Sequence, residues 1–116
     1  MGSGNRSLSK VSLARAISDA VRLVAGVADV SPGRFAELAT YGPGEKVPGV
    51  VVESAVDGLA IEVHLCVQYL DSLDLTELAA RVRDAVHRTG ETLGTGPINR
   101  VDVAFDDLRV AERVPP

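Results

Sequence analysis

The sequence predicts an α+β fold: a single-layer mixed sheet of about four strands with two helices on one face, in the order α-β-β-β-α-β. Three observations lead to this fold class. Two stretches repeat apolar residues at the spacing of an amphipathic helix, and a third alternates apolar with polar residues, as a strand with one open face does. Between two apolar stretches, Asp57-Gly58 favours the tight turn of a β-hairpin.

The first helix is expected from Ser9 to Ala25, and Gly26 is expected to end it. Its apolar residues recur every three or four positions, which places them on one side of the helix: Leu13, Ile17, Val21 and Val24. A turn at Ser31-Pro32-Gly33 should lead into a strand from Arg34 to Tyr41. The following segment, 42–49, is rich in Gly and Pro and is therefore expected to be a loop.

The hairpin should pair Val50 to Val56 with Leu59 to Tyr69. In the second strand, residues with odd numbers are apolar, while the other face holds Ala60, Glu62, His64, Cys66 and Gln68. The sheet should therefore have one open face. If the turn consists of Asp57 and Gly58 alone, Glu53 lies opposite Glu62 and Val51 lies opposite His64.

The second helix is expected over Leu75 to Val86, with Asp74 as its N-cap and with Gly90 as its stop. Glu77, three residues after Asp74, completes the pattern of a capping box. The last strand should cover Val101 to Phe105. If it runs parallel to the second hairpin strand, the helix between them is a right-handed crossover.

A chain of 116 residues, with 46% hydrophobic and 24% charged residues, has the size and composition of one globular domain. We expect a leader at residues 1–8, a single domain at 9–110 and a short tail at 111–116. The net charge of -4 provides no attraction for nucleic acid or for anionic lipid. No apolar run reaches the roughly 20 residues that span a bilayer, so no direct membrane insertion is expected. The single cysteine, Cys66, fits a reducing compartment, and a cytoplasmic protein is expected.

Three residues on the open face, Glu62, His64 and Cys66, are types that bind transition metals. Neighbours on one face of a strand lie roughly 7 Å apart, however, and a structural zinc site needs four ligands, so we expect an ordinary polar face and no metal. Cys66 could act as a nucleophile only with an activating base, and a structural role is expected instead. No catalytic residue, metal ligand or cofactor site is predicted.

A sheet covered by two helices also suggests an RNA-recognition module, but such modules stack bases on exposed aromatic residues. The chain has two Tyr, two Phe and no Trp, and its open face carries mainly carboxylates. That face is instead the candidate protein-contact surface, and we name it the open sheet face: Glu53, Glu62, His64, Asp102 and Asp106. Arg or Lys of a partner, or Arg100 of this chain, would offset its negative charge.

The pattern of elements resembles the bacterial alkaline shock protein family, also called the Gls-type general stress family. The likeness runs from about Ser9 to Leu108 and rests on five stretches: Ala25-Gly26-Val27, 49–52, the strand 59–69, the helix Leu75 to Val86, and Val101 to Phe105. The chain departs from the family pattern at Asp102, where Asn is common, and in having no long charged tail.

The resemblance implies a non-enzymatic protein of the bacterial cytoplasm that is linked to cell-envelope or alkaline stress. It also implies a homo-oligomer and a protein partner, such as an integral membrane protein that anchors it at the membrane. A scaffold or interaction protein is therefore the leading hypothesis. The alternative is a small regulatory or ligand-binding module that acts on a metabolic enzyme, because the same fold permits both.

Overall fold

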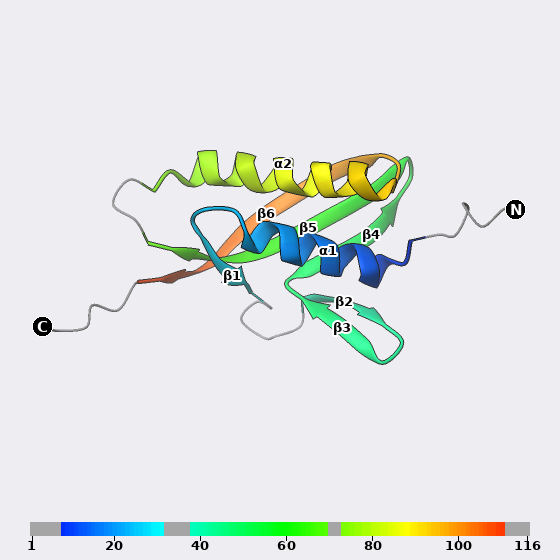
Figure 1. Ribbon diagram of the computed structural model, residues 1–116, viewed down its shortest axis with the longest axis horizontal. Coiled ribbons are helices and arrows are strands. Elements are labelled where there is room, and N and C mark those ends of the chain that lie inside the picture. Colours follow the sequence, from blue (N-terminus) through cyan, green and yellow to red (C-terminus); the bar gives the residue numbers. More distant parts are fainter. Residues whose placement is uncertain (1–7, 32–37, 70–72, 111–116) are drawn as a thin grey trace, which may run out of the picture.

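One long strand, β5 (Gly58–Gln68), lies at the centre of the main sheet in the computed structural model, which describes residues 8–31, 38–69 and 73–110 (Figure 1). Strands β1 (Val27–Val30) and β4 (Val50–Ala55) pair with β5 in the antiparallel sense. Both strands lie along the same edge of β5. The backbone of His64 shows this, because its amide donates to the carbonyl of Gly49, next to β4, and its carbonyl accepts from the amide of Ser31, next to β1. On the other edge, β6 (Ile98–Arg109) runs parallel to β5, so the sheet is mixed as predicted.

Helices α1 (Lys10–Arg22) and α2 (Leu75–Leu93) pack side by side on one face of this sheet. Helix α1 contacts β1 and β4, and α2 contacts β6. Both helices begin at a side-chain cap, since the Ser9 hydroxyl accepts from the Ser12 amide and the Asp74 carboxylate accepts from the Glu77 amide, each at 3.1 Å. The predicted fold class is confirmed.

The core lies between the helices and the odd-numbered residues of β5. Ile61, Val63, Leu65 and Val67 are almost wholly buried. The helical residues that cover them recur at helical spacing and are also buried: Ile17 and Val21 on α1, with Leu78, Val82 and Val86 on α2. The alternation of apolar and polar residues along β5 therefore predicted correctly which of its faces is covered by the helices.

Two short strands form a second sheet where the sequence analysis expected one strand and a loop. Strands β2 (Ala39–Gly42) and β3 (Glu45–Pro48) pair in the antiparallel sense. The hydroxyl of buried Thr40 joins this hairpin to the main sheet, because it donates to the Val50 carbonyl at 2.7 Å and accepts from the Val52 amide at 3.0 Å. Half of the expected 34–41 strand, and Pro32 and Gly33 of the turn before it, fall on residues 32–37, outside the described residues.

The predicted register of the β4–β5 hairpin is wrong. The turn consists of Val56 and Asp57, and Ala55 pairs with Gly58. Gly58 belongs to the strand because its backbone touches that of the segment before β6: a Cβ here would lie 2.4 Å from the Pro97 carbonyl oxygen. As a result Glu53 faces Ala60, and Val51 faces Glu62. The two glutamates are not direct cross-strand neighbours.

The ends of the elements also differ from the predicted ones. Helix α1 ends at Arg22, before Ala25. Helix α2 continues through Gly90 to Leu93, where Gly94 ends it in the left-handed conformation at φ 68. Gly90 is needed for close packing instead, because a Cβ there would lie 2.5 Å from the Ile98 side chain.

Asp29 links β1 to the end of α1. Its carboxylate accepts from the Arg22 guanidinium at 2.9 Å and from the Val30 amide at 2.8 Å. Burial raises the pKa of this carboxyl, but these two hydrogen bonds and the positive charges of Arg22 and Arg109 outweigh burial and hold the pKa below its ordinary value. The ionised form is therefore the one that stabilises the fold.

This ion pair predicts a pH-dependent effect of Asp29→Asn. A lowered folded-state pKa contributes stability that is present above the unfolded value of about 3.9 and is lost as pH falls through the folded value. Because the pair is half exposed, the variant should lose less than about 1 kcal/mol at neutral pH. Urea unfolding at several pH values should show the gap to wild type closing below about pH 4. A gap that stays constant down to acidic pH would contradict this role.

Charges placed in the core should abolish folding. Ile61→Asp and Val82→Asp each put an unpaired carboxylate at the contact between sheet and helices, and we expect a loss of more than about 4 kcal/mol. Circular dichroism should show no cooperative melt. Val56→Asp, at a position that is 99% exposed, is the matched control and should melt like wild type. Cooperative melting of either core variant near the wild-type temperature would contradict the assigned faces.

Candidate protein-contact surfaces

The structure brings three of the five predicted surface residues into one cluster on the open sheet face. His64 is buried, with 8% of its surface exposed, and its ring lies between two carboxylates. Its Nδ1 is 2.9 Å from Asp106 Oδ2, and its Nε2 is hydrogen-bonded to Glu62 Oε2. The cluster joins the central strand to β6 across the face that the helices leave uncovered.

Asp106 reaches His64 because β6 carries one extra residue at this point. Leu65 pairs with Phe105, but the next residue of β5, Cys66, pairs with Asp107. Asp106 is therefore the extra residue of a bulge, and bulges re-aim side chains in this way. The alternation of residue types predicted that Asp106 would share the face of His64, but it carried no signal for the bulge.

The hydrogen bonds of His64 determine what the cluster can do chemically. Both ring nitrogens of His64 are engaged by carboxylates, Nδ1 by Asp106 and Nε2 by Glu62. Cys66 is buried in the same strand. Within the described ranges, no group of three or more His, Cys, Asp and Glu side chains is placed to hold a metal ion.

The other two predicted residues lie outside this cluster. Asp102 neighbours Glu62 across the β5–β6 ladder, and its Oδ2 forms an ion pair with Arg100 Nε at 3.0 Å. Glu53 is exposed on β4 and lies apart from the cluster. It lines, together with Arg100, a shallow hollow of about 560 Å³ near the hairpin turn. The open sheet face thus carries more carboxylates than cations, even when the contacts of His64 and Arg100 with these carboxylates are taken into account.

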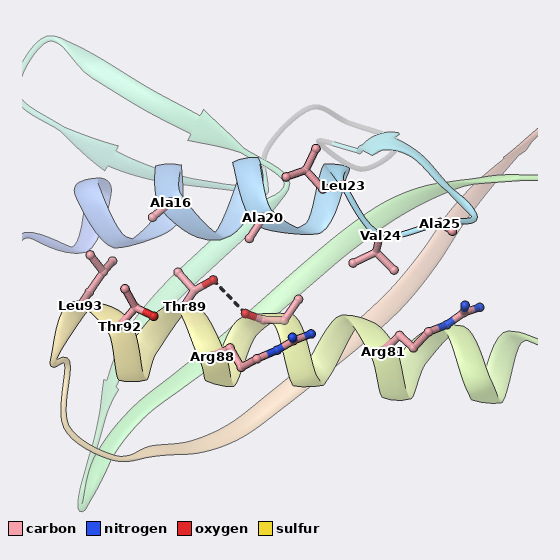
Figure 2. A pocket seen from close by; sticks show the side chains of 11 residues that line it. Ala16, Ala20, Leu23, Val24, Ala25, Arg81, Arg88, Thr89, Thr92 and Leu93 are labelled. Carbon is pink, nitrogen blue, oxygen red and sulfur yellow. Dashed lines mark hydrogen bonds between the residues drawn. The ribbon is translucent and has the colours of Figure 1, made fainter.

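A second surface, absent from the sequence analysis, lies on the outer side of the helices. It is a groove with a volume of about 620 Å³. Figure 2 shows it between α1 and α2, which run antiparallel. Its lining is mostly small or apolar, and we name it the helix groove: Ala16, Ala20, Leu23, Val24, Ala25, Arg81, Ala85, Arg88, Thr89, Thr92 and Leu93. Leu23, at the end of α1, is 86% exposed although it is apolar. Ala16, Ala20 and Leu23 recur at spacings of four and three, a signal that could have revealed the groove.

Charged and polar groups border the apolar lining of the helix groove. Arg88 pairs with Asp84 at 2.8 Å one turn earlier on α2. Arg81 forms no ion pair with any described residue. The Thr89 hydroxyl is engaged, because it donates to the Ala85 carbonyl at 2.8 Å. The groove therefore offers an apolar floor with one unpaired guanidinium at its border.

No family model matches the chain, and comparison with curated proteins and with solved structures also gives no match. The resemblance to alkaline shock proteins therefore rests on the residue pattern alone. Over residues 8–31, 38–69 and 73–110, no helix combines the length and the apolar character that crossing a bilayer requires.

The cluster predicts a specific cost for removing His64. His64→Ala leaves Glu62 and Asp106 close together without the ring between them, and we expect a loss of about 1–3 kcal/mol in the free energy of unfolding. Arg100→Ala removes the 70% exposed partner of Asp102 and should cost less than about 1 kcal/mol. Urea titrations of both variants measure the difference. Equal losses would show that His64 is no more important than an exposed ion pair.

Proposed function

We propose that this protein is a non-enzymatic interaction or scaffold protein. It works by self-association and, through the open sheet face, by contact with another protein. The observation that carries this proposal is the uncovered acidic face of a single-layer sheet. Its central carboxylates, Glu62 and Asp106, are held in place by a buried histidine. A surface with fixed charges loses little side-chain freedom when a partner binds.

The charge of the open sheet face indicates the kind of partner. Glu53 has no cation paired to it among the described residues, and Glu62, Asp102 and Asp106 are shared between only Arg100 and His64. A partner that presents Arg or Lys would complete this set. Electrostatic complementarity of this kind speeds association and selects partners, and it weakens as salt is added.

The biological setting follows from the resemblance to the alkaline shock proteins. We propose a role in cell-envelope or alkaline stress, in the cytoplasm, with an integral membrane protein as the partner that holds the chain at the membrane. The residue pattern from Ser9 to Leu108 supports this setting. The acidic face would then be the contact for a basic segment of that membrane partner.

The helix groove supports a second candidate, a small regulatory or ligand-binding module that acts on a metabolic enzyme. Its volume of about 620 Å³ falls within the range of roughly 300–1,000 Å³ that is typical of small-molecule sites. An apolar lining with a few polar groups at its border is also typical of such sites. The groove is open to one side, however, which suits a protein surface better than an enclosed ligand.

Site-specific photo-cross-linking in living cells tests the two candidates. A photoreactive residue at Ala60 or Ala104, both on the open sheet face, should give an adduct with one defined protein. The same residue at Tyr41 on the small hairpin, which is 64% exposed, is the matched control. Glu53→Lys with Asp102→Lys should remove the adduct while the melting temperature stays unchanged.

The identity of the adduct distinguishes the proposals. An envelope protein cross-linked from the open sheet face supports the scaffold, and a metabolic enzyme supports the regulatory module. Equal labelling from the sheet positions and from Tyr41, or an adduct that survives the double lysine variant, would contradict a working role for the acidic face.

A further inference from the structure

The outer surface of α2 carries a regular stripe of alternating charges. Its members recur at spacings of four and three residues, which places them on one side of the helix. All are exposed, and their charges alternate along the stripe: Glu77, Arg81, Asp84, Arg88 and Glu91. Arg88 and Asp84 pair within the chain, whereas Glu77, Arg81 and Glu91 form no ion pair within the described part of the chain.

This stripe is complementary to a second copy of itself that runs in the antiparallel direction. When Asp84 of one copy faces Arg88 of the other, Arg81 faces Glu91. A two-fold axis repeats both pairs, as an interface between two identical surfaces requires. Arg81 and Glu91 of the same chain are ten residues apart, about 15 Å along the helix, and cannot pair with each other. Two of the three stripe charges that lack partners in the monomer are thus ones that the second copy would pair.

The helix groove and Leu23 fit the same arrangement. In Figure 2 Ala16 lies beside Leu93 and Ala20 beside Thr89, and Leu23 lies along the helix axis between Thr89 and Arg81. Leu23 is therefore level with the middle of the antiparallel pairing, where the two-fold axis passes. The Leu23 side chains of the two copies would meet there, over the small residues of the two grooves. This burial removes from water one of the most exposed large apolar side chains of the described chain.

From this complementarity we infer that the outer helix surface, formed by the helix groove and the α2 charge stripe, is a two-fold interface with a second copy of this chain. The inference rests on the proposed function, since it specifies the surface through which self-association occurs. The dimer buries the helix layers at its centre and leaves the two open sheet faces on opposite outer sides. Each dimer would then present two identical acidic faces, and so could hold two partner molecules.

A charge exchange tests the pairing directly. Arg81→Glu and Glu91→Arg should each weaken dimerisation at least about tenfold, because each places like charges opposite one another twice per dimer. The double variant Arg81→Glu with Glu91→Arg restores opposite charges and should recover the wild-type affinity. Lys46→Glu, on β3 and outside both the helix groove and the α2 charge stripe, is the matched control. Sedimentation velocity over a concentration series measures the dissociation constant of each variant.

The apolar contact has its own test. Leu23→Ser should weaken the dimer at least about tenfold, and Val56→Ser, at an exposed apolar residue in the hairpin turn, should leave it unchanged. In a Cys66→Ala background, Leu23→Cys should form an intermolecular disulfide on mild oxidation, because the two positions meet at the axis. Val56→Cys should not. Melting curves of all variants check that the fold is intact.

Each outcome decides for or against the inference. A wild-type chain that stays monomeric up to its solubility limit would overturn it and leave the groove to a different protein or to a small ligand. A dimer that the charge exchange weakens without recovery in the double variant would also overturn the proposed pairing. If the helix variants are monomeric but still give the photo-adduct from the open sheet face, the two surfaces act separately. If the dimer forms but no adduct does, the proposed partner contact fails while this inference stands.

Discussion

The burial of one side of β5 is the constraint on which the rest of the structure depends. Ile61, Val63, Leu65 and Val67 can leave water only if something covers that side of the sheet, and the two helices do so. Because successive side chains on a strand point to opposite faces, the same strand must present Glu62 and His64 on the other side. The division into a helix surface and an open sheet face thus originates in the alternation of residues along a single strand.

The two surfaces differ in their chemistry in a way that suits different contacts. On the open sheet face, the bulge in β6 brings Asp106 to His64, so two carboxylates that would repel one another are each hydrogen-bonded to the same imidazole ring. On the helix surface, small residues leave a groove and Leu23 stays exposed beside it. An acidic face is complementary to a basic partner, whereas an apolar groove with a self-complementary charge stripe is complementary to a second copy of the chain.

Much of this fold could be predicted from the sequence, and the failures have physical causes. Periodicity identified α1, α2 and the two faces of β5, because burial imposes it directly. Glycine was the main source of error: Gly58 and Gly90 were interpreted as turn and stop signals, but each is required by a close tertiary contact, with Pro97 and with Ile98. Contacts of this kind, between residues far apart in the chain, cannot be predicted from the residues next to each glycine. The His64 cluster was predicted only as a shared face, since the bulge at Asp106 depends on pairing between distant strands.

We propose that copies of this chain meet through their helices and leave the open sheet face free for a partner. The most direct measurement is a dilution series of two-dimensional NMR spectra of the isotope-labelled wild-type chain. Concentration-dependent shifts should be confined to α1 and α2, with the largest at Leu23, Ala20 and Thr89, while amides of β4 and of the 100–106 part of β6 stay fixed. Shifts centred on those strands, or none at any concentration, would contradict the account.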